Sequence, residues 1–292
     1  MLPTLETPAR EAVPERRRRS RSRVALKRIS TLAGLVLGIL TLASNSMAEP
    51  GFDQIVVLGD SLSDQGNAGR FSNGPVWVEQ LAGRLGASLA PSRSGGLNFA
   101  VGGARLDAQS GSDSLRAQAA LFLKQPRPGG RTLYVVYGGG NDIFAAIGRP
   151  DGPAVVDRAI ASLVSILEDF ERLGPVDVLV PNLPDVGITP AVRARGSAAV
   201  IEAERLSARF NRGVEETLAK AERGAGIRIH RLDVWSMGER VKADPEALGF
   251  TDVTRPCRGL KTCEGHLFWD DVHPTVEAHA RLAAGADRAV HK

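Results

Sequence analysis

The chain has 292 residues, of which 43% are hydrophobic and 24% charged, and its formal net charge is +4. This length suits one large α/β domain or about two smaller domains. The composition excludes wholesale disorder, a collagen-like repeat and a polytopic membrane protein, because each of these classes departs strongly from such ordinary values.

The excess of positive charge lies in the first 48 residues. They hold nine lysines and arginines against three glutamates, so the rest of the chain carries a net charge of −2. A mildly acidic body removes the bulk electrostatic argument for nucleic-acid binding. We therefore expect no nucleic-acid partner.

A short apolar run, Thr31–Ala43, follows the basic segment, and the small residues Ser46 and Ala48 then occupy the −3 and −1 positions of a cleavage site. This order is typical of a secretory signal peptide covering residues 1–48. An uncleaved anchor helix is the alternative, but the run is shorter than the roughly 18–20 apolar residues of a bilayer span. We expect residues 49–292 to form the mature domain, which is secreted or periplasmic and has no stable membrane span after signal removal.

Short apolar runs alternate along the mature chain with longer segments of helical periodicity. Five runs predict strands at Gln54–Leu58, Leu97–Val101, Thr132–Tyr137, Val176–Val180 and Ile227–Leu232. Helices are predicted at Val76–Leu85, Ser114–Lys124, Ala154–Leu173 and Ala198–Arg223, with a last helix from about Pro274 to the C-terminus. Residues 236–268 are expected to be irregular. The alternation favours one layered α/β domain with a parallel sheet, whose turns at the carboxyl ends of the strands bind ligands.

Cys257 and Cys263 are the two cysteines of the chain, with five residues between them. In a secreted protein, an isolated pair at this spacing favours one small disulfide loop. A metal site would need more ligands, and only His266 lies near them in the sequence.

The first predicted strand ends in Gly59-Asp60-Ser61. A serine on a turn after a strand projects its hydroxyl from the sheet edge, and its backbone N–H lies where negative charge is favoured. The alternative is that Asp60 or Ser61 merely caps the following helix, since both residue types are preferred caps.

Asp270 lies three residues before His273, close to the C-terminal end of the chain. At this spacing a carboxylate can hydrogen-bond one imidazole nitrogen, which fixes the tautomer and leaves the other nitrogen free to act as a base. The pattern is common by itself, and a solvated surface histidine is the alternative.

Gly139-Gly140-Asn141-Asp142 follows the most apolar predicted strand. Its spacing fits neither of the glycine-rich phosphate-binding motifs. Asn141 is either a turn residue or a side-chain amide that donates to a developing oxyanion, with the backbone N–H of Gly103 as a second donor.

Together these motifs, in this order and each after a strand, resemble the GDSL or SGNH hydrolase family. Asn182–Pro190 also looks like the N-L-P-x-x-G-x-x-P segment of many members, so the likeness covers roughly residues 52 to 285. The resemblance implies Ser61, Asp270 and His273 as the catalytic residues, and Ser61, Gly103 and Asn141 as the oxyanion hole. Gly102 and Asp271 are the adjacent alternatives to Gly103 and Asp270.

The resemblance further implies a three-layer α/β/α flavodoxin-like fold with a five-stranded parallel sheet of order 2-1-3-4-5. It implies a serine esterase or lipase that cleaves small-molecule or lipid acyl esters, including lysophospholipids, through an acyl-enzyme, without a metal or organic cofactor. A carbohydrate acetylesterase is the enzymatic alternative. A non-catalytic binding protein and a nucleotide binder on the same fold are the alternatives of another class.

Overall fold

The computed structural model describes residues 51–224 and 226–292, and the predicted signal peptide lies outside them. A parallel sheet runs through this part of the chain. Its four strands are β1 (Gln54–Gly59), β2 (Thr132–Tyr137), β3 (Val176–Pro181) and β4 (Ile227–Leu232), in the order β1-β2-β3-β4. Among the described residues, no helix is long and apolar enough to cross a bilayer.

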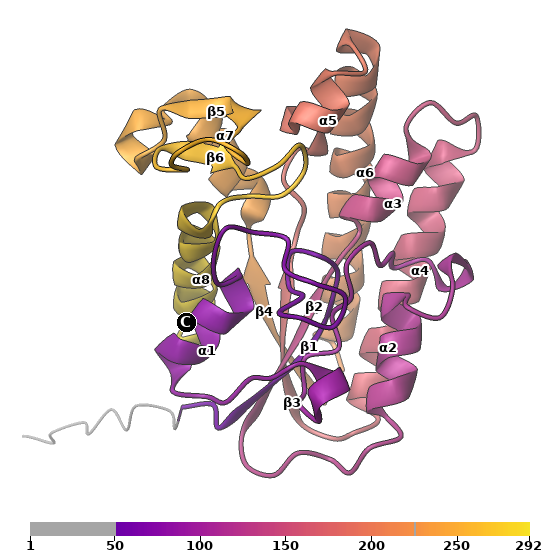
Figure 1. Ribbon diagram of the computed structural model, residues 1–292. Helices are drawn as coiled ribbons and strands as arrows, with labels where there is room; N and C mark the ends of the chain where they lie inside the picture. Colours follow the sequence, from indigo (N-terminus) through magenta and orange to yellow (C-terminus); the bar gives the residue numbers. More distant parts are fainter. Residues whose placement is uncertain (1–50, 225) are drawn as a thin grey trace, which may run out of the picture. The chain divides into compact units, whose positions relative to one another are not determined.

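Helices cover both faces of the sheet (Figure 1). Helices α1 (Trp77–Leu85) and α8 (Val276–Val290) pack together on one face, and α2 (Leu115–Phe122), α4 (Gly152–Glu171) and α6 (Ser197–Ala221) on the other. The shorter helices are α3 (Gly140–Ala146), α5 (Pro190–Arg193) and α7 (Val234–Ala243). The predicted three-layer α/β/α arrangement and all of the predicted long helices are therefore present, with ends that differ by a few residues.

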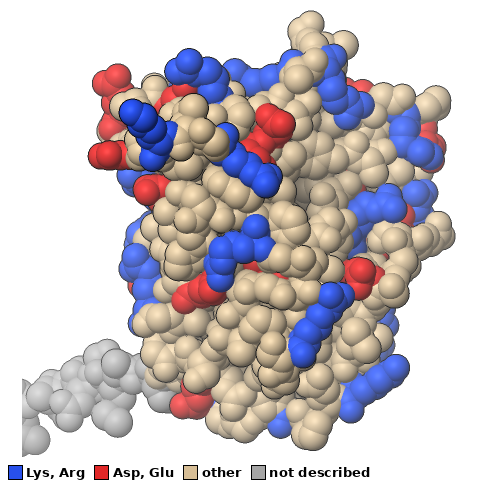
Figure 2. Space-filling model, viewed as in Figure 1, with Lys and Arg blue, Asp and Glu red and all other residues tan. Residues whose placement is uncertain are grey.

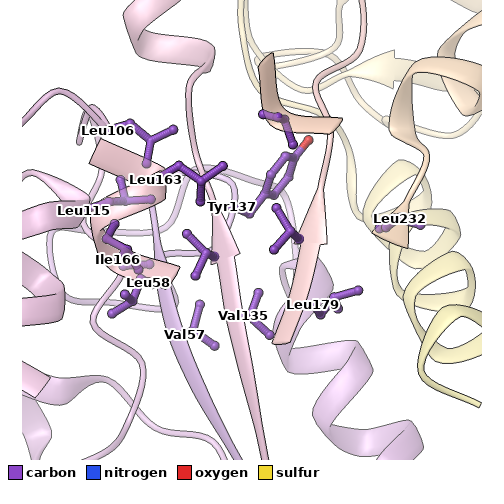
Figure 3. Close-up of a cluster of buried hydrophobic side chains, with 14 of the residues drawn as sticks. Val57, Leu58, Leu106, Leu115, Val135, Tyr137, Leu163, Ile166, Leu179 and Leu232 are labelled. Carbon is purple, nitrogen blue, oxygen red and sulfur yellow. The ribbon is translucent and has the colours of Figure 1, made fainter. Parts of the chain in front are cut away.

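The core lies between the sheet and these helices. β1 and β2 are buried along almost their whole length, as expected for parallel strands that are covered on both faces. The helices contribute the apolar stripes that their periodicity predicts, and Leu163 and Ile166 of α4 belong to the same buried cluster as Leu58 and Val135 of the strands (Figure 3). This core fixes the ends of the strands, and with them the loops that follow.

The prediction of a fifth strand at 97–101, and hence the order 2-1-3-4-5, is wrong. The segment lies along the outer edge of β1, where Val57 N–H donates to Leu97 O at 3.0 Å, Phe99 N–H to Val57 O at 2.8 Å and Val101 N–H to Gly59 O at 3.2 Å, but only Val57 and Asn98 pair as in a parallel strand. Gly59 N–H, which would continue the ladder, donates instead to Gln118 Oε1 at 2.9 Å. The same side chain also donates to Gly59 O at 2.8 Å, so a glutamine of α2 occupies the one N–H that a continuous ladder would need.

The region predicted to be irregular is more ordered than expected. After α7 it contains a two-stranded parallel sheet of β5 (Asp252–Pro256) and β6 (His266–Phe268). β5 was not predicted from the sequence because none of its residues is fully buried, so the strand shows no alternation of apolar and polar residues. The predicted disulfide between Cys257 and Cys263 is formed and closes the connection between the two strands.

Candidate active site

Ser61 lies in the tight turn that leaves β1. Asp60 organises this turn, because its carbonyl oxygen accepts the backbone N–H groups of Ser63 and Asp64, both at 3.0 Å. No long helix follows, since α1 begins only at Trp77, so the alternative role of Ser61 as a helix cap is wrong. The turn holds the Ser61 side chain at the carboxyl edge of the sheet, largely buried at 6% exposure.

His273 meets Ser61 from the far end of the chain, in the loop between β6 and α8. The distance from His273 Nε2 to Ser61 Oγ is 2.8 Å. On the other side of the ring, Nδ1 lies 2.8 Å from Asp270 Oδ2. Because a carboxylate can only accept, the proton lies on Nδ1, and Nε2 is left to accept the hydroxyl proton of Ser61.

Asp270 is itself fixed by its own loop. Its Oδ1 accepts the backbone N–H groups of Val272 at 2.9 Å and His273 at 2.7 Å. Burial raises the pKa of Asp270, but the hydrogen bonds from the His273 ring and from these N–H groups outweigh burial and hold it below its usual range. The neighbouring Asp271 is exposed, and the structure brings Asp270 rather than Asp271 to the imidazole.

Asn141 and Gly103 come together at the ends of two other loops. Asn141, in the first turn of α3, donates one Nδ2 hydrogen to Ala104 O at 2.9 Å and keeps the second for another acceptor. Gly103, at φ +80°, is exposed, and within residues 51–224 and 226–292 no hydrogen bond occupies its N–H. Gly102 N–H, by contrast, donates to Asp64 Oδ2 at 2.9 Å. Of the two adjacent glycines, Gly103 therefore has the free donor.

Two buried carboxylates that the sequence analysis assigned no function tie these loops together. Asp64 is fully buried and accepts the N–H groups of Asn67 at 2.6 Å and Gly102 at 2.9 Å, so it links the turn after β1 to the glycine loop. Asp142 accepts the N–H groups of Leu106 at 2.9 Å and Asp107 at 3.1 Å. The sequence shows that these two aspartates lie close to Ser61 and Asn141. It does not show which backbone N–H groups donate hydrogen bonds to them.

Phe71 is a further neighbour that no motif indicated. Its ring lies 5.1 Å from the His273 ring, centroid to centroid, at an interplanar angle of 35°. This ring contact restricts rotation of the imidazole, and so it complements the hydrogen bond to Asp270.

Burial also acts on Asp60. It raises the pKa of this carboxyl group to about 6, while the Leu62 N–H and the charge of His273 act in the opposite direction. Asp142 has a pKa of about 6 for the same main reason, although its two backbone donors oppose the shift. Two carboxyl groups close to Ser61 and Asn141 therefore change charge near pH 6.

A cavity of about 380 Å³ opens beside Ser61. Asp60, Tyr137 and Asn141 line it at the sheet edge, and most of the remaining wall is apolar. The apolar part comes from the segment after β3, from α7 and α8, and from β6, with Leu183, Val186, Met237, Val241, Phe268 and Leu282 among its members. The described part of the chain holds no group of three or more His, Cys, Asp or Glu side chains that could hold a metal ion.

Charged side chains are spread over the surface of the described domain. On the face that Figure 2 shows, lysines and arginines lie among aspartates and glutamates over most of the visible elements. The cavity beside Ser61 differs from this surface because its wall is mainly apolar.

Comparison with known proteins extends the likeness to the whole domain. The profile of the GDSL-like lipase/acylhydrolase family matches residues 55–286. A phosphatidylcholine-sterol acyltransferase of Aeromonas hydrophila is 24% identical, with 86% of this chain and 94% of that protein covered. Lipase 1 of Photorhabdus luminescens is 32% identical over 53% of this chain, which spans only 26% of that longer protein.

Solved structures agree in fold. A member of the lipolytic G-D-S-L family from Veillonella parvula superposes with a TM-score of 0.50 at 15% identity, covering 81% of this chain and 97% of that one. A catalytic mutant of an acetylxylan esterase from Geobacillus stearothermophilus gives a TM-score of 0.52 at 18% identity, covering 84% and 96%. With the family profile covering most of its length, the chain belongs to the GDSL-like lipase/acylhydrolase family.

Proposed function

We propose that the protein is a serine esterase that hydrolyses carboxylic esters through an acyl-enzyme. One observation carries this proposal: Ser61 Oγ lies 2.8 Å from His273 Nε2, and Asp270 holds the opposite nitrogen of the same ring. A nucleophile, a base and a group that orients the base, each within hydrogen-bond distance of the next, are the requirements for nucleophilic catalysis by serine.

In the first step, His273 Nε2 takes the hydroxyl proton as Ser61 Oγ attacks the ester carbonyl carbon. Asp270 stabilises the resulting imidazolium and keeps its ring in place. The tetrahedral intermediate then collapses, the bond to the alcohol oxygen breaks, and His273 returns the proton to that oxygen. The acyl group stays on Ser61.

The negative oxygen of the intermediate needs donors that are already in position. The backbone N–H groups of Ser61 and Gly103 and the second Nδ2 hydrogen of Asn141 are the candidates, because no hydrogen bond within the described domain occupies them. Donors fixed before the reaction stabilise developing charge without the cost of reorganising water.

The second step is hydrolysis. A water molecule gives its proton to His273 Nε2 and attacks the acyl carbonyl, and the same donors stabilise the second intermediate. Its collapse releases a carboxylic acid and restores the Ser61 hydroxyl with the proton from His273.

The cavity beside Ser61 favours an acyl group with a hydrocarbon chain. The mainly apolar wall beside Ser61 favours an acyl ester of lipid type over an acetylated carbohydrate, whose sugar hydroxyls would need polar partners. Lipids and lysophospholipids are therefore the proposed substrates. The disulfide between Cys257 and Cys263 supports the proposed export, since such bonds persist in oxidising compartments.

Replacing Asn141 by alanine is expected to lower kcat by about 10²–10³-fold with little change in KM, because it removes a donor used only when charge develops. Steady-state kinetics on p-nitrophenyl butyrate measures the effect. Asn182 provides a matched control: it follows β3 at the same sheet edge and bonds to Asp233, but does not line the cavity. An Asn141→Ala variant as active as Asn182→Ala would contradict the role.

The function itself is tested by incubating residues 49–292 with p-nitrophenyl butyrate, a lysophospholipid and acetylated xylan. We expect release of nitrophenolate and fatty acid and little acetate from xylan. Turnover of acetylated xylan alone would instead favour the carbohydrate acetylesterase. Absence of hydrolysis of every ester would contradict the proposal.

A further inference from the structure

The cavity extends well beyond Ser61, along one side of α8. Ala278, Arg281, Leu282, Ala284 and Arg288 line it, from near the start of the helix to its last turn. The helix begins three residues after His273, so the cavity leads away from the imidazole. Ten residues of α-helix span about 15 Å, which gives the length of this wall.

The opposite wall is α7. Val234, Met237, Gly238 and Val241 line the cavity from this helix, and Phe250 and Phe268 close it from the small sheet region. Arg240, Arg281 and Arg288 also line it, but all three are exposed. Their aliphatic stems can cover apolar surface, and the guanidinium group of Arg281 lies over the Phe250 ring, 5.3 Å from its centroid. The space between α7 and α8, here called the α7–α8 channel, is thus apolar inside and cationic at its rim.

Gly238 takes up the least space of the α7 residues in this wall, because it has no side chain. It lies inside α7, and a Cβ atom built there would meet only the Cβ of Pro184, at an ordinary contact distance of 3.6 Å. Pro184 lines the cavity as well. A larger side chain at position 238 would therefore fit the backbone and occupy the channel.

We propose that the α7–α8 channel holds the hydrocarbon chain of the acyl group bound to Ser61, and that Gly238 sets the chain length it accepts. This rests on the proposed esterase function. The cavity of about 380 Å³ includes both this channel and the space beside Ser61. At about 1.2 Å per bond of extended chain, a 15 Å wall matches about a dozen bonds.

The proposal predicts a rise of kcat/KM with acyl length in the wild-type protein. Each buried methylene contributes about 0.8 kcal/mol, or up to about fourfold in kcat/KM, until the channel is filled. With p-nitrophenyl esters from acetate to dodecanoate, kept below their aggregation concentrations, we expect the rise to continue to about ten to twelve carbons.

Gly238→Leu tests the channel directly. Leucine favours a helix more than glycine does, so the substitution should not unfold α7. We expect the ratio of kcat/KM for decanoate to that for acetate to fall at least tenfold. Ala284→Leu, which enters the channel from α8, should lower the same ratio, and thermal unfolding of both variants checks that they are folded.

Gly83 offers a matched control for the same substitution. It lies inside helix α1, away from the cavity, and a Cβ built there meets nothing within 4 Å. Gly83→Leu should leave the chain-length profile of the wild type unchanged. An active wild-type protein whose decanoate-to-acetate ratio is unaltered by both channel variants would overturn the channel and leave the esterase function standing. A wild-type protein inactive on every ester would overturn both.

Discussion

Ser61→Ala is expected to lower kcat on p-nitrophenyl butyrate by about 10⁴–10⁶-fold. The substitution removes the one oxygen that His273 Nε2 contacts at 2.8 Å, and no other hydroxyl group is bonded to that nitrogen in the described structure. It should change the free energy of unfolding by no more than about 1.5 kcal/mol, the contribution of a single hydrogen bond. Kinetics and urea unfolding measure the two effects separately.

Ser63→Ala is the matched control, because Ser63 belongs to the same turn and is fully buried. Its hydroxyl accepts the indole N–H of Trp77 at 3.0 Å and has no bond to His273. Leaving that buried N–H unpaired should cost about 1–3 kcal/mol of stability but less than tenfold in kcat. If Ser61→Ala kept more activity than Ser63→Ala, the assignment of the nucleophile would be wrong.

His273→Ala is expected to be as damaging as Ser61→Ala, at about 10⁴–10⁶-fold in kcat. Without the imidazole, the hydroxyl has no base, and a serine at its ordinary acidity is a weak nucleophile. The double variant Ser61→Ala/His273→Ala should be hardly worse than either single variant, since the groups act as a unit. Progress curves on p-nitrophenyl butyrate for all three variants check this.

His266→Ala controls for the loss of a histidine from the same region of the chain. Its Nδ1 lies 3.2 Å from Arg255 O, at the small sheet, and the side chain has no contact with Ser61. We expect its kcat to stay within about twofold of the wild type. Effects of His273→Ala and Ser61→Ala that multiplied in the double variant would mean that the two residues act independently, against the mechanism.

The fold was largely predictable from hydrophobic pattern. Thr132–Tyr137 is an almost continuous apolar run because its strand is buried on both faces, and such a run is hard to mistake. Val176–Val180 is apolar except for Asp177, which is only half-buried. Leu97–Val101 is apolar except for Asn98, but it does not form a strand, because the Gln118 side chain competes for the N–H of Gly59. That competition joins residues 59 positions apart, which no local pattern encodes.

The candidate site was predictable where chemistry imposes a motif. The G-D-S turn, the G-x-N-D turn and the D-x-x-H loop each follow or precede a recognisable element, and the topology of a parallel sheet brings such loops to one edge. The structure indeed places Ser61, Asn141 and His273 at that edge. The choice between Gly102 and Gly103 as the free donor required the structure, because it depends on which of the two N–H groups is bonded to Asp64.

The walls of the cavity were not predictable in the same way. Phe71 reaches His273 across about 200 residues of chain, and Gly238 lines the channel only because the fold brings α7 and α8 to the same cavity. Both contacts are consequences of packing between elements that are distant in sequence. No polar motif marks these positions in the sequence. An apolar residue, or a glycine in a helix, therefore gives the same sequence pattern whether it lines a cavity or fills a core.

The most direct test of the account is covalent capture of the nucleophile. Ser61 Oγ should attack the phosphorus of an alkyl fluorophosphonate while His273 takes its proton; the P–F bond breaks and fluoride leaves. One phosphonyl group then remains per chain, and peptide mass spectrometry should locate it on Ser61. The reaction should be absent in Ser61→Ala and strongly slowed in His273→Ala. An active wild-type enzyme labelled at another residue, or labelled equally fast without His273, would contradict the claim that Ser61 is the nucleophile activated by His273.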